Sequence, residues 1–139
     1  MNAMAPPRPT ELQGCRVRLA AGPTAPAQAR RQVQALIRAW DVPVDPDVAA
    51  LLTSELVTNA IRHEPGPTVT VSITCSRGEL RVDVHDTSRR LPVLVDAAAD
   101  AEAGRGLMLV VTLAADWGVY RDPAGKAVYF TLGLQPPVF

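Results

Sequence analysis

Residues 68–86, TVTVSITCSRGELRVDVHD, constrain the fold more than any other part of this chain. Apolar and polar residues alternate on both sides of Ser76-Arg77-Gly78-Glu79, and a period of two is typical of strands with one buried face. A short turn containing glycine between two such runs predicts a β-hairpin. The chain is therefore expected to contain an antiparallel sheet with one apolar face that helices can cover.

Two further regions predict strands. CRVRLA, residues 15–20, alternates in the same way, and GVYRD with KAVYFTLGL predicts a second hairpin around Pro123-Ala124-Gly125. The predicted order is strand, helix, helix, hairpin, long loop, helix, hairpin. This order favours an α+β two-layer sandwich, with a mixed, mostly antiparallel sheet and helices on one face.

Three segments predict helices. Thr24 is a candidate N-cap for the first helix, and Asp45 followed by Pro46 is a typical start for the second, which we expect to span 46–63. The third begins at the glycines of GRGLMLVVTLAADW, residues 104–117. Because this segment is apolar on all sides, we expect it to be buried.

Length and composition favour a single domain. A chain of 139 residues with 47% apolar residues can bury a core, so we assign residues 13–139 to one domain and expect the Pro- and Ala-rich residues 1–12 to be disordered. The net charge of zero argues against direct binding to nucleic acid or membranes. The apolar runs are too short for a membrane span or a secretory signal, which predicts a cytoplasmic protein.

Glu55 and Asn59 are the first candidate site residues, because they lie one turn apart in the second predicted helix. The solvent-exposed side of an ordinary amphipathic helix would look similar. Two features argue against that interpretation. Val48, Leu51 and Leu52 make the same side apolar where it begins, and asparagine has a weak preference for the interior of a helix.

Two further candidates follow along the chain. Asp86 ends a strand just before the loop 88–104, whose length is typical of a lid, although aspartate in this position also initiates turns. Gly104 and Gly106 expose backbone N–H groups at a helix N-terminus, where a phosphate is favoured, and Arg105 adds positive charge. The alternative for the glycines is a loop that needs a positive φ before the helix.

Together, ELVTNAIRH, VHDTS and GRGLMLV resemble the N-box, G1 box and G2 box of the GHKL superfamily of ATPases and kinases. The closing DWGVYRDPAGKAVYF is similar to the end of such domains, and the resemblance covers roughly residues 15–134. Within the superfamily, the short chain most resembles the anti-sigma-factor serine/threonine kinases of the RsbW type. The resemblance implies a Bergerat-type ATP-binding fold, with ATP and Mg²⁺ as cofactors.

The resemblance also implies roles for individual residues. Asn59 matches the Mg²⁺ ligand, and Glu55 matches the position proposed as general base. Asp86 matches the carboxylate that accepts a hydrogen bond from the exocyclic amine of adenine. Gly104 and Gly106 match the glycines that let the triphosphate approach the backbone.

Arg62 and His63 hold the last N-box positions, which in relatives reach toward phosphate or ribose. The chain departs from the family in the G1 box, where the usual Asp-x-Gly-x-Gly reads DTSRR, residues 86–90. Both glycines are missing, so the lid hinge is expected to be stiffer and the rim of the nucleotide pocket more crowded.

As a whole, the resemblance implies an ATP- and Mg²⁺-dependent protein kinase that phosphorylates a serine or threonine of an antagonist protein. Its partners would be a sigma factor or similar regulatory target and an anti-anti-sigma-type antagonist, with a homodimer as a family expectation. Two alternatives stay open. One is a nucleotide-binding interaction module without useful kinase activity, favoured by the altered G1 box, and the other is a nucleotide-free α+β scaffold.

Overall fold

The computed structural model describes residues 13–62, 66–76, 78–87, 108–123 and 125–135. Its elements in chain order are β1 (Gln13–Ala20), α1 (Ala25–Ala39), α2 (Pro46–Arg62), β2 (Thr68–Ser76), β3 (Glu79–Asp86), β4 (Asp116–Asp122) and β5 (Gly125–Gly133). Residues 108–113 are also helical. The tail predicted for 1–12 and the lid predicted for 88–104 lie outside the described residues.

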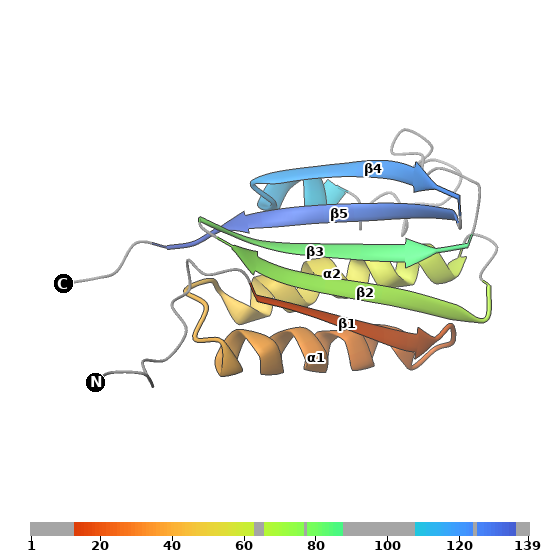
Figure 1. The fold of residues 1–139 in the computed structure, drawn as a ribbon, viewed down its shortest axis with the longest axis horizontal. Coiled ribbons are helices and arrows are strands. Elements are labelled where there is room, and N and C mark those ends of the chain that lie inside the picture. The colour runs from red at the N-terminus through yellow and green to blue at the C-terminus, as the bar shows by residue number, and fades with distance from the viewer. Residues whose placement is uncertain (1–12, 63–65, 77, 88–107, 124, 136–139) are drawn as a thin grey trace.

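The strands form one five-stranded sheet in the order β1-β2-β3-β5-β4 (Figure 1). All four neighbouring pairs are antiparallel, which confirms both predicted hairpins. The turn of the first hairpin contains Gly78 with a φ of 86°, a conformation that side chains other than glycine rarely adopt. The pairing of β3 with β5 joins the two hairpins and places Asp86 opposite Lys126.

Both α1 and α2 lie on one face of this sheet, so the predicted two-layer α+β architecture is confirmed (Figure 1). α2 packs against β2, β3 and β5, and α1 packs against α2 and β1. In β2, β3 and β5, the apolar half of the alternation faces the helices and is buried: Val69, Val71, Ile73, Leu80, Val82, Val84 and Phe130. Burial of such a side chain stabilises the fold by about 1.5–3 kcal/mol.

The two long helices begin at the predicted caps, but the caps differ in their hydrogen bonds. Asp45 Oδ1 accepts hydrogen bonds from the backbone N–H groups of Asp47, at 2.9 Å, and Val48, at 3.4 Å. Thr24 occupies the N-cap of α1, but its side chain makes no capping hydrogen bond. Only the cap of α2 is therefore expected to contribute through its side chain.

We expect Asp45→Ala to lower the free energy of unfolding by about 1 kcal/mol, because it leaves N–H groups in the first turn of α2 without an acceptor. Urea unfolding measures this loss. Thr24→Ala is the matched control, since it replaces the N-cap residue of α1, whose side chain makes no capping hydrogen bond. It should change stability by less than about 0.5 kcal/mol. Equal losses in the two variants would contradict the role of Asp45.

The third helix is not buried, and the prediction made from its composition is wrong for its described part. Within residues 108–113, Val110 is buried, whereas Met108, Val111 and Leu113 are 53%, 38% and 42% exposed. Val110 joins the core on one side. The segment lies behind β4 at the edge of the helical layer in Figure 1, because α2 already covers the central strands. No helix among the described residues is long and apolar enough to cross a membrane.

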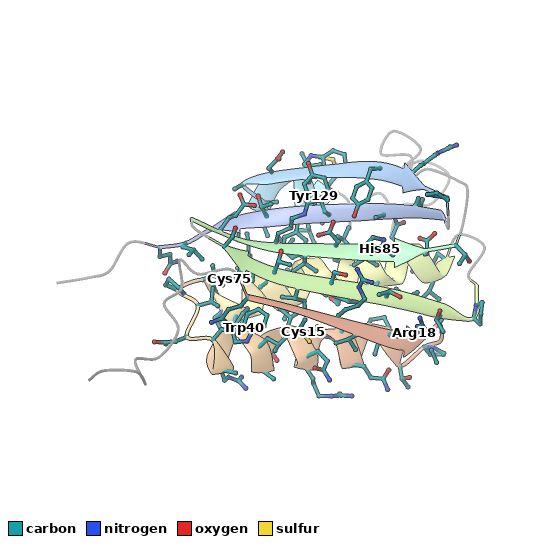
Figure 2. All side chains as sticks on the ribbon, in the orientation of Figure 1. Cys15, Arg18, Trp40, Cys75, His85 and Tyr129 are labelled. Carbon is teal, nitrogen blue, oxygen red and sulfur yellow. The ribbon has the colours of Figure 1, made fainter. Side chains whose placement is uncertain are left out.

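The sheet face turned away from the helices carries a polar network of its own. Arg81 donates two hydrogen bonds to Asp83, from Nε to Oδ1 at 2.8 Å and from Nη2 to Oδ2 at 2.9 Å. Tyr120 donates to Asp83 Oδ2 at 2.8 Å, and burial together with this bond raises the pKa of Tyr120 to about 12. The Arg81 guanidinium also lies over the Tyr129 ring, 4.0 Å from its centroid. Figure 2 shows Tyr129 and His85 on this face, so the network lies on the opposite side of the sheet from α2.

Candidate functional site

In the C-terminal half of α2, the side-chain amide of Asn59 is buried although the same side of the helix is accessible to solvent one turn earlier. Asn59 is 6% exposed, and Glu55, one turn earlier, is half-buried. Leu51, another turn back on the same side, is 37% exposed. The side of α2 that carries Glu55 is therefore accessible, but Asn59 is covered, so an ordinary solvent-facing side does not describe Asn59.

The buried polar groups of α2 differ in how their hydrogen bonds are satisfied. Thr53 Oγ1 donates to the Ala49 carbonyl at 2.8 Å, and Ser54 Oγ donates to the Leu51 carbonyl at 2.9 Å. By contrast, Asn59 Oδ1 has no hydrogen-bond partner among the described residues. A buried oxygen in that state destabilises a fold by about 1–3 kcal/mol. Its chemistry suits a ligand that supplies a donor or a cation, and a carboxamide oxygen is a ligand that Mg²⁺ accepts.

Asp86 ends β3 on the side of the sheet that the helices cover, and it is paired with a lysine. Lys126 Nζ lies 3.3 Å from Asp86 Oδ2, and both side chains are 2% exposed. The two residues are direct partners in the β3·β5 register. Sequence analysis identified Asp86 but missed Lys126, because alternation indicates the face on which a residue lies and not which strands are neighbours.

Glycines allow the backbone to pack closely around the end of β3. A Cβ on Gly125 would overlap the carbonyl oxygen of Asp86, and a Cβ on Gly66 would overlap Thr87 Oγ1. The start of β5 and the segment before β2 therefore contact the end of β3 directly. This packing fixes the backbone that positions the Asp86 carboxylate.

Three elements bring the candidate residues to the same end of the molecule. α2 ends at Arg62, β3 ends at Asp86 and β5 begins at Gly125, and these ends lie together in Figure 1. The fold thus brings Asn59 and Asp86 to one end, with the Arg62 side chain exposed beside them. The predicted site residues His63, Gly104, Arg105 and Gly106 lie outside the described residues.

A cavity of about 410 Å³ opens elsewhere, at the N-terminal end of α2. Its lining includes Asp45, Val48 and Leu113 but neither Asn59 nor Asp86, so it is separate from the candidate site. In the part of the chain that the structure describes, no group of three or more His, Cys, Asp or Glu residues could hold a metal ion. A Mg²⁺ ion at Asn59 would therefore depend on oxygens of a bound ligand and water, as is usual for Mg²⁺ beside phosphates.

A family model for the histidine kinase-like ATPase domain matches residues 19–132. The chain belongs to this family. The matched range of this histidine kinase-like ATPase domain includes Glu55, Asn59, Asp86 and Lys126. Membership in the family implies an ATP-binding site, and such a site is consistent with the Asn59 oxygen, which lacks a partner within the described part of the chain, and with the buried carboxylate of Asp86.

Known proteins that are similar to this histidine kinase-like ATPase domain include the following two. The uncharacterized protein SCO4941 of Streptomyces coelicolor is 36% identical over an alignment of 89 residues, and the match covers 61% of this chain and 85% of SCO4941. The crystal structure of the RsbU and RsbW domains of Rv1364c from Mycobacterium tuberculosis matches 90% of this chain with a TM-score of 0.67 and 18% identity. This chain spans 33% of that larger one. At this level of identity the likeness shows that the two share a fold, which is that of the RsbW domain.

Proposed function

We propose that this domain is an ATP- and Mg²⁺-dependent serine/threonine protein kinase that acts as an anti-sigma-type regulator and phosphorylates an antagonist protein. The observation that carries the proposal is the buried Asn59, whose Oδ1 has no partner among the described residues. Half-buried Glu55 lies one turn before it on the accessible side of α2. A cation ligand alone would serve any nucleotide-binding protein, whereas a carboxylate one turn away suits proton transfer as well.

In this proposal, the chain's own residues bind, orient and move a proton. Asn59 contributes one oxygen to the coordination of Mg²⁺, which when bound neutralises charge on the phosphates. Glu55 accepts the proton of the attacking serine or threonine hydroxyl. Asp86 accepts a hydrogen bond from the nucleobase. The remaining proposed nucleotide contacts come from Arg62, His63, Gly104, Arg105 and Gly106.

The proposed partners rest on the resemblance of the sequence motifs to anti-sigma-factor kinases, and the similarity in fold to the RsbW domain of Rv1364c supports them. One partner is a sigma factor or a similar regulatory target, and the other is an anti-anti-sigma-type antagonist that accepts the phosphate. We place the protein in the cytoplasm and propose a homodimer as its assembly. The net charge of zero agrees with protein partners rather than with nucleic acid.

A second function, a nucleotide-binding interaction module without useful kinase activity, is favoured by two observations. Asp86 forms an ion pair with Lys126, so part of the capacity of the carboxylate to accept hydrogen bonds is in use before any base binds. The residues after Asp86 read TSRR, where the family has glycines. The ion pair leaves less of the carboxylate available to the base, and the missing glycines make the hinge of the predicted lid stiffer. Both features are expected to slow the turnover of nucleotide.

Transfer of phosphate from ATP to a purified anti-anti-sigma-type protein separates the two functions. We expect Glu55→Gln to lower the transfer rate by about a hundredfold or more, which is the usual effect of losing a general base. The affinity for MgATP should change by less than about threefold, because the substitution removes an interaction made in the transition state.

Glu79→Gln is the matched control for this experiment, because Glu79 begins β3 and lies at the far end of that strand from Asp86. This variant should keep both the affinity and the transfer rate. Unchanged transfer in Glu55→Gln would remove Glu55 as the base. A wild-type protein that binds MgATP but transfers no phosphate to any antagonist tested would support the binding module instead.

A further inference from the structure

Lys126 is the only lysine among the 14 lysine and arginine residues of the chain. This single amine is also buried, since its side chain is 2% exposed and its Nζ lies 3.3 Å from Asp86 Oδ2. Removing an ion pair from water is unfavourable unless the geometry and further hydrogen bonds compensate. A buried lysine at the candidate nucleotide site therefore calls for an explanation other than surface charge.

Asp83, a second buried aspartate among the described residues of the sheet, is neutralised by an arginine in a purely structural pair. On the open face, Arg81 binds both oxygens of Asp83 with its planar guanidinium. At Asp86 the partner is an ammonium instead, which is a compact point charge with three donors. An ammonium can donate to Asp86 and to another acceptor at the same time.

The group that meets this pair is the substituent at position 6 of a purine, which the proposed function puts against Asp86. In adenine this substituent is an amino group, a donor, whereas in guanine and hypoxanthine it is a keto oxygen, an acceptor. A lone carboxylate accepts from the amino group and repels the keto oxygen. A site that relies on one such hydrogen bond can reject the analogue that lacks it by about 10⁴-fold or more.

We propose that Lys126 is a specificity-determining residue of the nucleobase site, and that the Asp86–Lys126 pair admits purine nucleoside triphosphates with either a 6-amino or a 6-keto group. This inference rests on the proposed nucleotide site and adds its base selectivity. With adenine, Asp86 accepts a hydrogen bond from the amino group. With guanine or hypoxanthine, Lys126 donates to the keto oxygen, so the repulsion by the carboxylate is offset.

ATP and inosine triphosphate (ITP) are the sharpest probes, because their bases differ in the 6-substituent and the protonation of the adjacent ring nitrogen. In calorimetric titrations with Mg²⁺, we expect the wild type to bind the two nucleotides with Kd values within about tenfold of each other. Lys126→Met removes the ammonium and keeps an unbranched side chain. It should weaken binding of ITP by at least about a hundredfold more than binding of ATP.

Arg121→Met is the matched control, because Arg121 is exposed and pairs with Lys126 in the β4·β5 register. It should keep both affinities. A wild type that binds ATP more than about tenfold tighter than ITP would overturn the inference and leave the proposed function in place. A folded wild type that binds neither nucleotide would overturn both.

A second measurement uses the wild type alone, since Lys126→Met removes one partner of a buried pair and can unfold the chain. Labelling lysine with ¹⁵N at Nζ gives one ammonium signal in NMR, because the chain has a single lysine. We expect this signal to move on addition of ATP and to move to a different position with ITP. A stationary signal under conditions where calorimetry shows saturable binding would overturn the role of Lys126.

Discussion

Asn59→Ala is expected to lose about a hundredfold in affinity for MgATP while its free energy of unfolding stays level or rises. A polar contact to a charged group is worth up to about 3 kcal/mol, and each 1.4 kcal/mol changes Kd about tenfold. The substitution also removes a buried oxygen that has no partner among the described residues. That gain in stability offsets the small cavity left by the shorter side chain.

Calorimetry with and without Mg²⁺ isolates the role of the carboxamide. In excess EDTA, the wild type and Asn59→Ala should bind ATP with similar affinity, because the difference between them depends on the cation. Thr58→Ala is the matched control, since Thr58 is the half-buried neighbour of Asn59 on α2. Undiminished binding of MgATP by Asn59→Ala would move the nucleotide site away from α2, and a large loss of stability would make Asn59 a structural residue.

The second large effect concerns stability, and we expect it from the pair Asp86 and Lys126. Either Asp86→Leu or Lys126→Met should lower the free energy of unfolding by about 3–5 kcal/mol, because each leaves an uncompensated charge among buried groups. The double variant should lose clearly less than the sum of the two, since it leaves neither charge behind. Urea unfolding of the four proteins gives the coupling energy directly.

Arg121→Met serves again as the control and should change stability by less than about 0.5 kcal/mol. Additive losses in the double variant would show that the two charges are stabilised by other groups rather than by one another. Folded domains are stable by about 5–15 kcal/mol, so single variants of this pair will fold best at low temperature or with a bound nucleotide.

The local architecture was predictable from sequence because each hairpin and cap is encoded by residues close together in the chain. The alternation of residues 68–86 specifies which side chains of β2 and β3 face the helices, and the buried set agrees with it. Asp45 caps α2 as expected. The position of Asp86 at the end of a strand also follows from this local pattern.

Features that depend on non-local packing were not predictable in the same way. Lys126 was missed as the partner of Asp86 because the β3·β5 pairing joins two hairpins that the sequence pattern leaves unordered. The burial of residues 108–113 was overestimated, since an apolar composition does not reveal that α2 already occupies the centre of the sheet. The burial of Asn59 depends on the same packing.

The same topology bears on the order in which the chain acquires its structure during folding. Each hairpin closes through a short turn, whereas β3 can meet β5 only after the whole stretch between Asp86 and Lys126 has looped back. Closing a long loop is entropically unfavourable, and non-local strand pairing is slow. The pairing of β1 with β2 likewise spans a long stretch of chain, so the two charged groups meet at one of the two seams that close late. A nascent or half-assembled chain does not present the complete base-recognition pair until β3 has paired with β5.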